Sequence, residues 1–146
     1  MTTHGNETSA NAERAPRTEP DARAVTDAPS PRTRGAPVVQ KAYDLLVWLV
    51  PVIDKMPRAR KFTLGDRVES AALEVLEALT EAAYTKDRAA PLRRAALALQ
   101  RLRLLLRLAK DVKALDFKRY GHAAVTVDEI GRMIGGWSRH DKGRTV

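Results

Sequence analysis

The chain has 146 residues, 30% of them charged, a formal net charge of +8 and no cysteine. This length suits one domain. The lack of cysteine excludes disulfides, thiolate catalysis and cysteine-ligated zinc or iron–sulfur sites.

Residues 1–37 have the composition of a disordered tail. They include no Leu, Ile, Phe, Tyr or Trp, and their five Arg are balanced by five acidic residues. Such a segment cannot bury enough apolar surface to offset its conformational entropy. No apolar run follows Met1 and no stretch reaches transmembrane length. We therefore expect no secretory signal, no membrane partner and a cytoplasmic location.

The spacing of apolar residues predicts two helices in the first half of the folded part. The first spans about residues 38–56, and Pro51 inside it predicts a kink or local break near Leu49. The second begins near Thr63 or Asp66, where the local sequence offers an N-terminal cap.

Two further helices are predicted in the second half. The third begins near Pro91, which suits the first turn of a helix, and continues to about Lys113. The fourth spans about residues 116–134, and Gly135 and Gly136 are a natural C-terminal stop.

No part of the sequence is typical of a strand. Short connections between helices of this length favour an all-α, up-and-down four-helix bundle. We assign the bundle domain to residues 38–139 and a short flexible C-terminus to residues 140–146.

The positive charge is concentrated between residues 88 and 119. This stretch holds ten Lys/Arg and two acidic residues, an excess equal to the net charge of the whole chain, and it is also the most leucine-rich part. On a helical wheel of the third helix, one sector collects basic residues together with one glutamine and one alanine. They are Arg93, Ala96, Gln100, Arg103, Arg107 and Lys110.

The rest of this wheel is apolar over roughly 220–240°, about twice what a surface helix of a monomeric bundle needs. One side carries Leu97, Leu104, Leu108 and Leu115, and the other carries Leu99, Leu102, Leu105, Leu106 and Ala109. We expect one side to pack in the bundle and the other against another subunit, which predicts a homo-oligomer. The alternative is a central helix that both neighbours in its own bundle cover.

Catalytic and metal-binding patterns are weak. The three histidines are isolated, no Ser–His–Asp set can be assembled, and residues 131–136 lack the strand and the Lys-Ser/Thr of a phosphate loop. We expect no enzyme activity, no metal and no cofactor. The glutamates of the second helix are interpreted as a solvated face that is able to pair with a basic one; they are Glu69, Glu74, Glu77 and Glu81.

The basic residues point instead to a polyanion. Arginine predominates over lysine in the third helix, and its planar guanidinium suits phosphate. We favour binding to the nucleic-acid backbone, without base readout, over a merely solvated face. The candidates are Arg93, Arg94, Arg101, Arg103, Arg107 and Lys110 in the third helix, and Arg58, Arg60 and Lys61 in the loop before the second.

Four segments in succession resemble the accessory variability determinant (Avd) of diversity-generating retroelements. This group belongs to a four-helix-bundle family that includes the intervening-sequence protein of 23S ribosomal RNA. The segments are YDLLVWLVP at 43–51, FTLGDR at 62–67, LRLLLRLAKD at 102–111 and DEIGRMIGGW at 128–137.

The resemblance implies a pentameric barrel and a non-catalytic partner of a reverse transcriptase. Such a protein binds the reverse transcriptase, template RNA and cDNA, and supports mutagenic reverse transcription and retrohoming. Besides the third-helix positions, the matched segments contain Arg67 and Arg132, which become candidate binding residues. Two alternatives stay open: an intervening-sequence-type protein that binds structured or ribosomal RNA, and a helical adaptor for an acidic protein partner.

Overall fold

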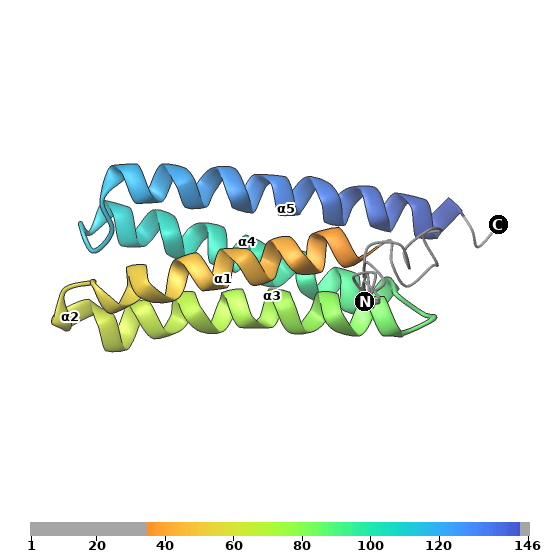
Figure 1. Ribbon diagram of the computed structural model, residues 1–146, viewed down its shortest axis with the longest axis horizontal. Helices are drawn as coiled ribbons and strands as arrows, with labels where there is room; N and C mark the ends of the chain where they lie inside the picture. Colours follow the sequence, from red (N-terminus) through yellow and green to blue (C-terminus); the bar gives the residue numbers. More distant parts are fainter. Residues whose placement is uncertain (1–34, 144–146) are drawn as a thin grey trace, which may run out of the picture.

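The computed structural model describes residues 35–143, and within this range the chain is all-helical with no strand. The elements are α1 (Ala36–Asp54), the short α2 (Arg58–Arg60), the π-helical η2 (Lys61–Gly65), α3 (Asp66–Tyr84), α4 (Ala89–Asp111) and α5 (Phe117–Gly143). The four long helices run alternately up and down (Figure 1). The prediction of a four-helix bundle is confirmed.

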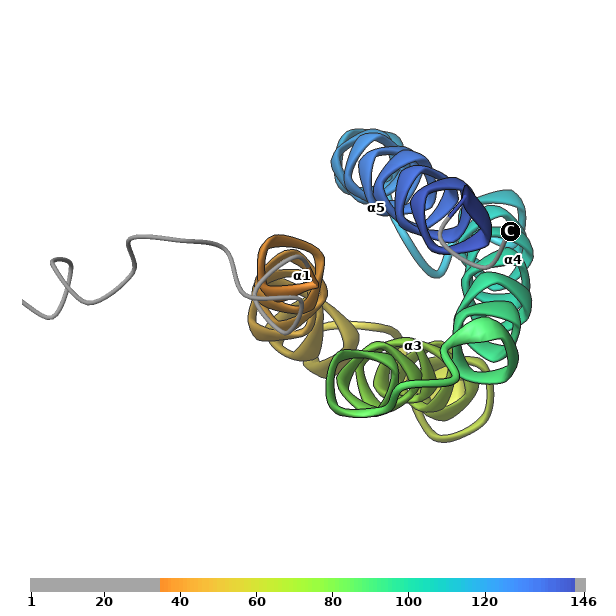
Figure 2. The same cartoon turned by 90° about the vertical axis from the view of Figure 1, so that its right-hand side faces the viewer.

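Viewed along the bundle, the chain passes from α1 through α3 and α4 to α5, so that α1 and α4 stand on opposite sides (Figure 2). The α3–α4 pair shares the most extensive contact, and the α1–α5 pair shares the least of the four neighbouring pairs. Alanines contribute much of the buried surface of α3 and α4, which lets these two helices approach closely.

The core is apolar and contains side chains from every long helix. Among the described residues, none that is polar or charged is buried. The fully buried side chains include Leu49, Leu79, Leu102 and Ile130, one from each long helix. Burial of these side chains is the main source of stability for a bundle of this kind.

The α1 helix does not break at Pro51 as predicted. It continues to Asp54 with Pro51 inside it. Pro51 and Val47, four residues earlier, are both exposed. Water can therefore satisfy the backbone carbonyl that the proline ring leaves without a donor.

Among the described residues, α1 is also the one helix whose length and composition would allow it to cross a membrane. The expectation that no stretch reaches this length is therefore wrong for α1. Seven of its residues are buried in the bundle, including Val38 and Ile53. A core helix of a bundle passes the same test of length and composition.

The predicted cap at the start of α3 is wrong. Gly65 has helical dihedral angles, and no side chain caps α3. Helical backbone begins at Arg58, directly after Pro57, and continues through η2 into α3. Arg58, Arg60 and Lys61 consequently lie in a helical turn and not in a loop.

The α4 helix ends at Asp111 in a Schellman motif. Lys113 adopts a φ of 65°. The N–H of Lys113 donates to the Lys110 carbonyl, and the N–H of Ala114 donates to the Ala109 carbonyl. The wheel groups Leu115 with Leu97, Leu104 and Leu108 on one side of this helix, but Leu115 follows the motif and, unlike these three, is buried.

The α5 helix continues through Gly135 and Gly136 to Gly143, so the predicted stop is wrong. Among the described residues no glycine has a positive φ. The buried Trp137 keeps this last part of the helix on the bundle, because its ring lies where a Cβ of Gly35 would be. Residues 140–143 are thus helical, while the remainder of the proposed C-terminal segment and residues 1–34 lie outside the described range.

Arg88 forms several contacts at the end of the bundle where Trp137 lies. Its Nε donates to the Ala82 carbonyl at 3.0 Å, and its Nη1 lies 3.2 Å from Asp141 Oδ1. Its guanidinium also lies 6.0 Å from the centre of the Trp137 ring. Arg88 therefore links the end of α3 to the last turns of α5.

Candidate nucleic-acid interface

The arginines on one side of α4 pair with α3. Arg94 forms an ion pair with Glu81, and Arg101 Nη2 lies 3.0 Å from Glu74 Oε1. No acidic residue is close to these arginines in the sequence of α4, because their partners, Glu74 and Glu81, belong to α3. Both pairs are exposed, so they contribute little to stability and leave the arginines accessible.

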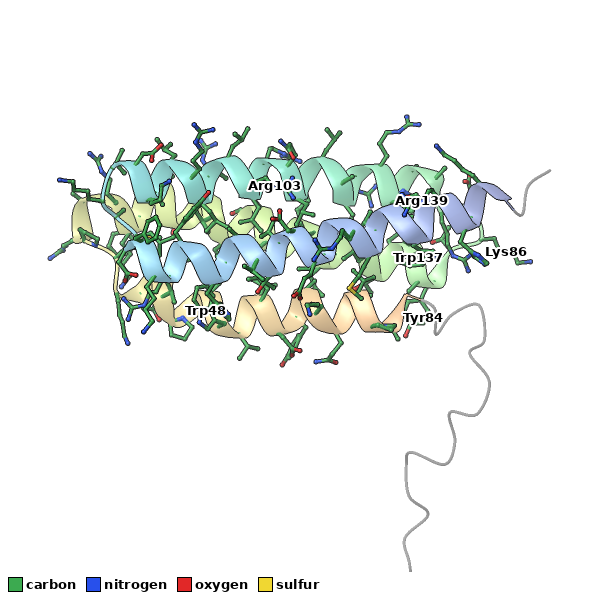
Figure 3. The ribbon with its side chains drawn as sticks, turned by 90° about the horizontal axis from the view of Figure 1, so that it is seen from above. Trp48, Tyr84, Lys86, Arg103, Trp137 and Arg139 are labelled. Atoms are coloured by element: carbon green, nitrogen blue, oxygen red, sulfur yellow. The ribbon has the colours of Figure 1, made fainter. Side chains whose placement is uncertain are left out.

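A groove with a volume of about 580 Å³ runs between α4 and α5. Three arginines, one acid, one amide and several small or apolar residues line it: Arg103, Arg132, Arg139, Asp128, Gln100, Ala96, Leu99, Gly131, Ile134 and Gly135. Arg103 and Arg139 lie along this seam from opposite helices (Figure 3). The groove thus unites predicted residues from the third and fourth helices.

Arg103 is held in place at the side of this groove. Its Nη1 donates to Gln100 Oε1 at 2.7 Å, and its Nη2 donates to Asp128 Oδ1 at 3.0 Å. These two bonds use both terminal nitrogens and fix the guanidinium plane. Asp128, the one acid of the groove lining, is therefore already occupied by Arg103.

Three other arginines near this seam form no ion pair within 4.0 Å among the described residues. Arg132 and Arg139 line the groove itself. Arg93 lines a smaller hollow of about 220 Å³, which shares Ala96 with the groove. All three are exposed. Their charge is available to an external anion.

Two glycines of α5 leave space in the groove because they have no side chain. A helix interior disfavours glycine by about 1 kcal/mol relative to alanine, yet Gly131 and Gly135 lie inside α5. A Cβ at Gly131 would lie 3.4 Å from Leu99 Cδ2, an ordinary contact, so core packing does not require glycine there. A Cβ at Gly135 would lie 3.4 Å from Arg139 Nη1. The space is used by arginine side chains.

The last turn of α4 carries two further predicted residues. Lys110 Nζ lies 3.6 Å from Asp111 and 4.5 Å from the centre of the Tyr120 ring. Arg107 Nε lies 3.9 Å from the same carboxylate, and both groups are exposed. These two residues lie beyond the groove lining, toward the end of the bundle that carries η2.

The remaining predicted residues gather at that end. Arg60 and Arg67 line a second groove of about 680 Å³, together with Phe62, Leu105, Leu108 and others. Lys61 lies 5.4 Å from the centre of the Phe62 ring, and Arg58 is exposed on α2. The structure therefore divides the candidate residues among three regions and does not form a single stripe.

Two helices expose apolar side chains on their outer faces. On α4, Leu97, Leu104 and Leu108 are 59%, 55% and 48% exposed, and Val112 extends the same face. The structure therefore assigns this side of the predicted wheel to the outer surface of the bundle. On the opposite side of the bundle, α1 exposes Tyr43, Val47 and Val50 at helical spacing. We call these surfaces the α4 stripe and the α1 stripe.

Two carboxyl groups have lowered pKa values. The backbone N–H of Arg119 donates to Asp116 Oδ1 at 2.7 Å and holds the pKa of Asp116 below its ordinary value. This bond caps the N-terminus of α5, near the predicted start. The Lys41 ammonium, which pairs with Glu129 across the α1–α5 seam, lowers the pKa of Glu129, with a smaller contribution from Arg132.

Sequence reasoning missed Arg139. The predicted helix ends before Gly135, so the sequence pattern does not extend the helix to Arg139. In α5, separations of three and four residues place 132, 135 and 139 on one side. The nearby Trp137 was the available signal, because a large apolar residue after the glycines indicates that the packed segment continues. The described residues also contain no group of three or more His, Asp or Glu side chains that could hold a metal.

These features define a basic four-helix bundle with a groove on one seam and two apolar outer faces. A protein-family model described as bAvd-like matches residues 37–140. The chain belongs to this family and is an Avd-type accessory protein, as the four sequence segments indicate. The family is non-catalytic. No curated protein and no solved structure matches the chain.

Proposed function

We propose that this protein serves a diversity-generating retroelement by binding its reverse transcriptase together with template RNA and cDNA. In this role it supports mutagenic reverse transcription and retrohoming. Membership of the bAvd-like family carries the proposal. The exposed arginines of α4 and α5 without ion pairs, Arg93, Arg132 and Arg139, provide the physical means of holding a polyanion.

The charge distribution supports binding to a strongly anionic partner. The arginines that pair with α3 remain exposed, and those at the α4–α5 seam have no acid within ion-pair distance except at Arg103. A formal charge of +8 per copy attracts nucleic acid, and the range of this attraction is the Debye length, which shortens as ionic strength rises. Binding should therefore weaken steeply with ionic strength.

We further propose that copies assemble into a ring, a pentamer by family resemblance, in which the α4 stripe of one copy meets the α1 stripe of the next. Arg101 and Arg107 border the α4 stripe, whereas Asp44 and Asp54 lie on the exposed side of α1. Pairing α4 with α4 would oppose arginines, and pairing α4 with α1 brings opposite charges together. Two different faces on opposite sides make a heterologous contact, which forms a closed ring if the rotation allows.

The test is co-purification with the reverse transcriptase of a diversity-generating retroelement and with its template RNA. The wild-type protein should retain both, and a triple variant with Glu in place of Arg93, Arg132 and Arg139 should lose the RNA while keeping its helicity by circular dichroism. A variant with Ala at the exposed Lys55 and Lys118 is the control. Retention of structured ribosomal RNA without the polymerase, or of an acidic protein alone, would contradict the proposal.

A further inference from the structure

We propose that the groove between α4 and α5 is a binding site for the phosphodiester backbone of a single-stranded polynucleotide. The strand is held by Arg103, Arg132 and Arg139. This inference rests on the proposed function and assigns the nucleic-acid contact to one seam of the bundle and to one form of nucleic acid.

The charge of the groove fits two or more phosphates. Its lining contains three guanidinium groups and one carboxylate, Asp128, which accepts a hydrogen bond from Arg103. Arg132 and Arg139 are seven residues apart on α5, a separation of about 10 Å along the helix axis. Each presents several N–H donors in one plane, which match the oxygens of a phosphate.

The position of the arginines favours a single strand over a duplex. Arg139 Nη1 and Arg103 Nη2 lie 3.4 Å and 3.5 Å from the Cβ positions of Gly135 and Gly131, so the charges lie at the level of the α5 backbone. Packed helices are about 8–10 Å apart. A single backbone can lie between two such ridges and reach the guanidinium groups of Arg103 and Arg139 near the α5 backbone, whereas the thicker duplex must rest on the ridges.

The composition of the lining predicts little base preference. None of the groove's lining residues is aromatic, so bases have no ring to stack on. Leu99 and Ile134 offer apolar surface, and the amide oxygen of Gln100 already accepts a hydrogen bond from Arg103. The contact is therefore electrostatic and salt-dependent, with the strand's bases facing outward.

The direct test measures the affinity of the full chain for a fluorescent uridine oligonucleotide of about 12 nucleotides and for a duplex of similar length. Arg132→Ala with Arg139→Ala should weaken single-strand binding by about tenfold or more and reduce the salt slope by about 1.4, because two phosphate contacts are lost. Duplex binding should change much less. The control Lys55→Ala with Lys118→Ala removes the same charge elsewhere and should change both affinities equally and slightly.

A second variant changes the shape of the groove without changing its charge. Gly131→Ala with Gly135→Ala should raise the melting temperature, because alanine favours a helix, and should weaken single-strand binding by filling the floor. Unchanged single-strand affinity in both variants would overturn the inference. Equal losses for the duplex, or full displacement of the oligonucleotide by polyglutamate at the same charge concentration, would overturn it as well.

The two proposals fail in different ways. If the wild-type protein binds the oligonucleotide through the groove but does not co-purify with the reverse transcriptase, the proposed function fails and the groove stands. If it co-purifies with the reverse transcriptase and the groove variants bind the oligonucleotide like the wild type, the groove assignment fails alone.

Discussion

Replacing Leu104 and Leu108 with glutamate tests whether the α4 stripe is a subunit interface. About half of each side chain is exposed in the single bundle. Full burial of a leucine contributes about 1.5–3 kcal/mol, so covering the exposed half gives roughly 1 kcal/mol per residue and roughly 2 kcal/mol for the pair. A glutamate carboxylate in the interface adds a desolvation cost.

A loss of about 2 kcal/mol or more corresponds to at least about a 30-fold weaker association at each interface. Sedimentation velocity over a concentration series should therefore show an oligomer for the wild type and a monomer for the double variant. The two substitutions lie outside the core, so the helical signal should be retained.

The matched control places glutamate at Leu73 and Val125, which are 40% and 59% exposed on α3 and α5, outside both stripes. This variant should sediment like the wild type. An unchanged oligomer in the Leu104 and Leu108 variant would refute the interface, as would equal dissociation of the control.

Three further predictions concern stability, each measured by thermal or urea unfolding. Asp116→Ala removes the cap of α5 and should lower the melting temperature by a few degrees at neutral pH. Because the pKa of Asp116 is lowered from its ordinary 3.8, its stabilisation is present above that pH and disappears as pH falls through the lowered value. The variant and the wild type should then converge, and a constant gap would contradict this cause. Lys113→Gly should stabilise the protein by about 1 kcal/mol, because glycine adopts the left-handed conformation without strain, and a loss of stability would argue against the Schellman motif. Arg88→Ala should cost about 2 kcal/mol, since it removes two hydrogen bonds and leaves Asp141 without its partner; faster amide exchange confined to the last turns of α5 should accompany it, and protection there equal to the wild type would count against the link.

The fold could be predicted because its signals are local. The spacing of apolar residues in α3 and α4 is regular, and it correctly separates the buried Leu102 and Leu106 from the exposed Leu104 and Leu108. The same pattern could not reveal that α5 continues past its glycines. That outcome depends on Trp137 packing at the start of α1, a contact between residues far apart in the sequence.

The candidate site was harder to predict for the same reason. Charge counting found the arginines of α4 but could not tell which of them meet acids of other helices, as Arg101 meets Glu74 and Arg103 meets Asp128. The groove exists only where α4 and α5 lie together, and its glycines looked like a helix stop in the sequence. Arg139 lines the groove only because α5 continues past these glycines.

The central claim is that this protein enables a reverse transcriptase to copy its template RNA. The most direct measurement is the yield of cDNA from template RNA by the reverse transcriptase of a diversity-generating retroelement, with and without this protein. We expect abundant cDNA with the wild-type protein, and little without it or with Glu at Arg93, Arg132 and Arg139. Equal cDNA in all of these reactions would contradict the claim.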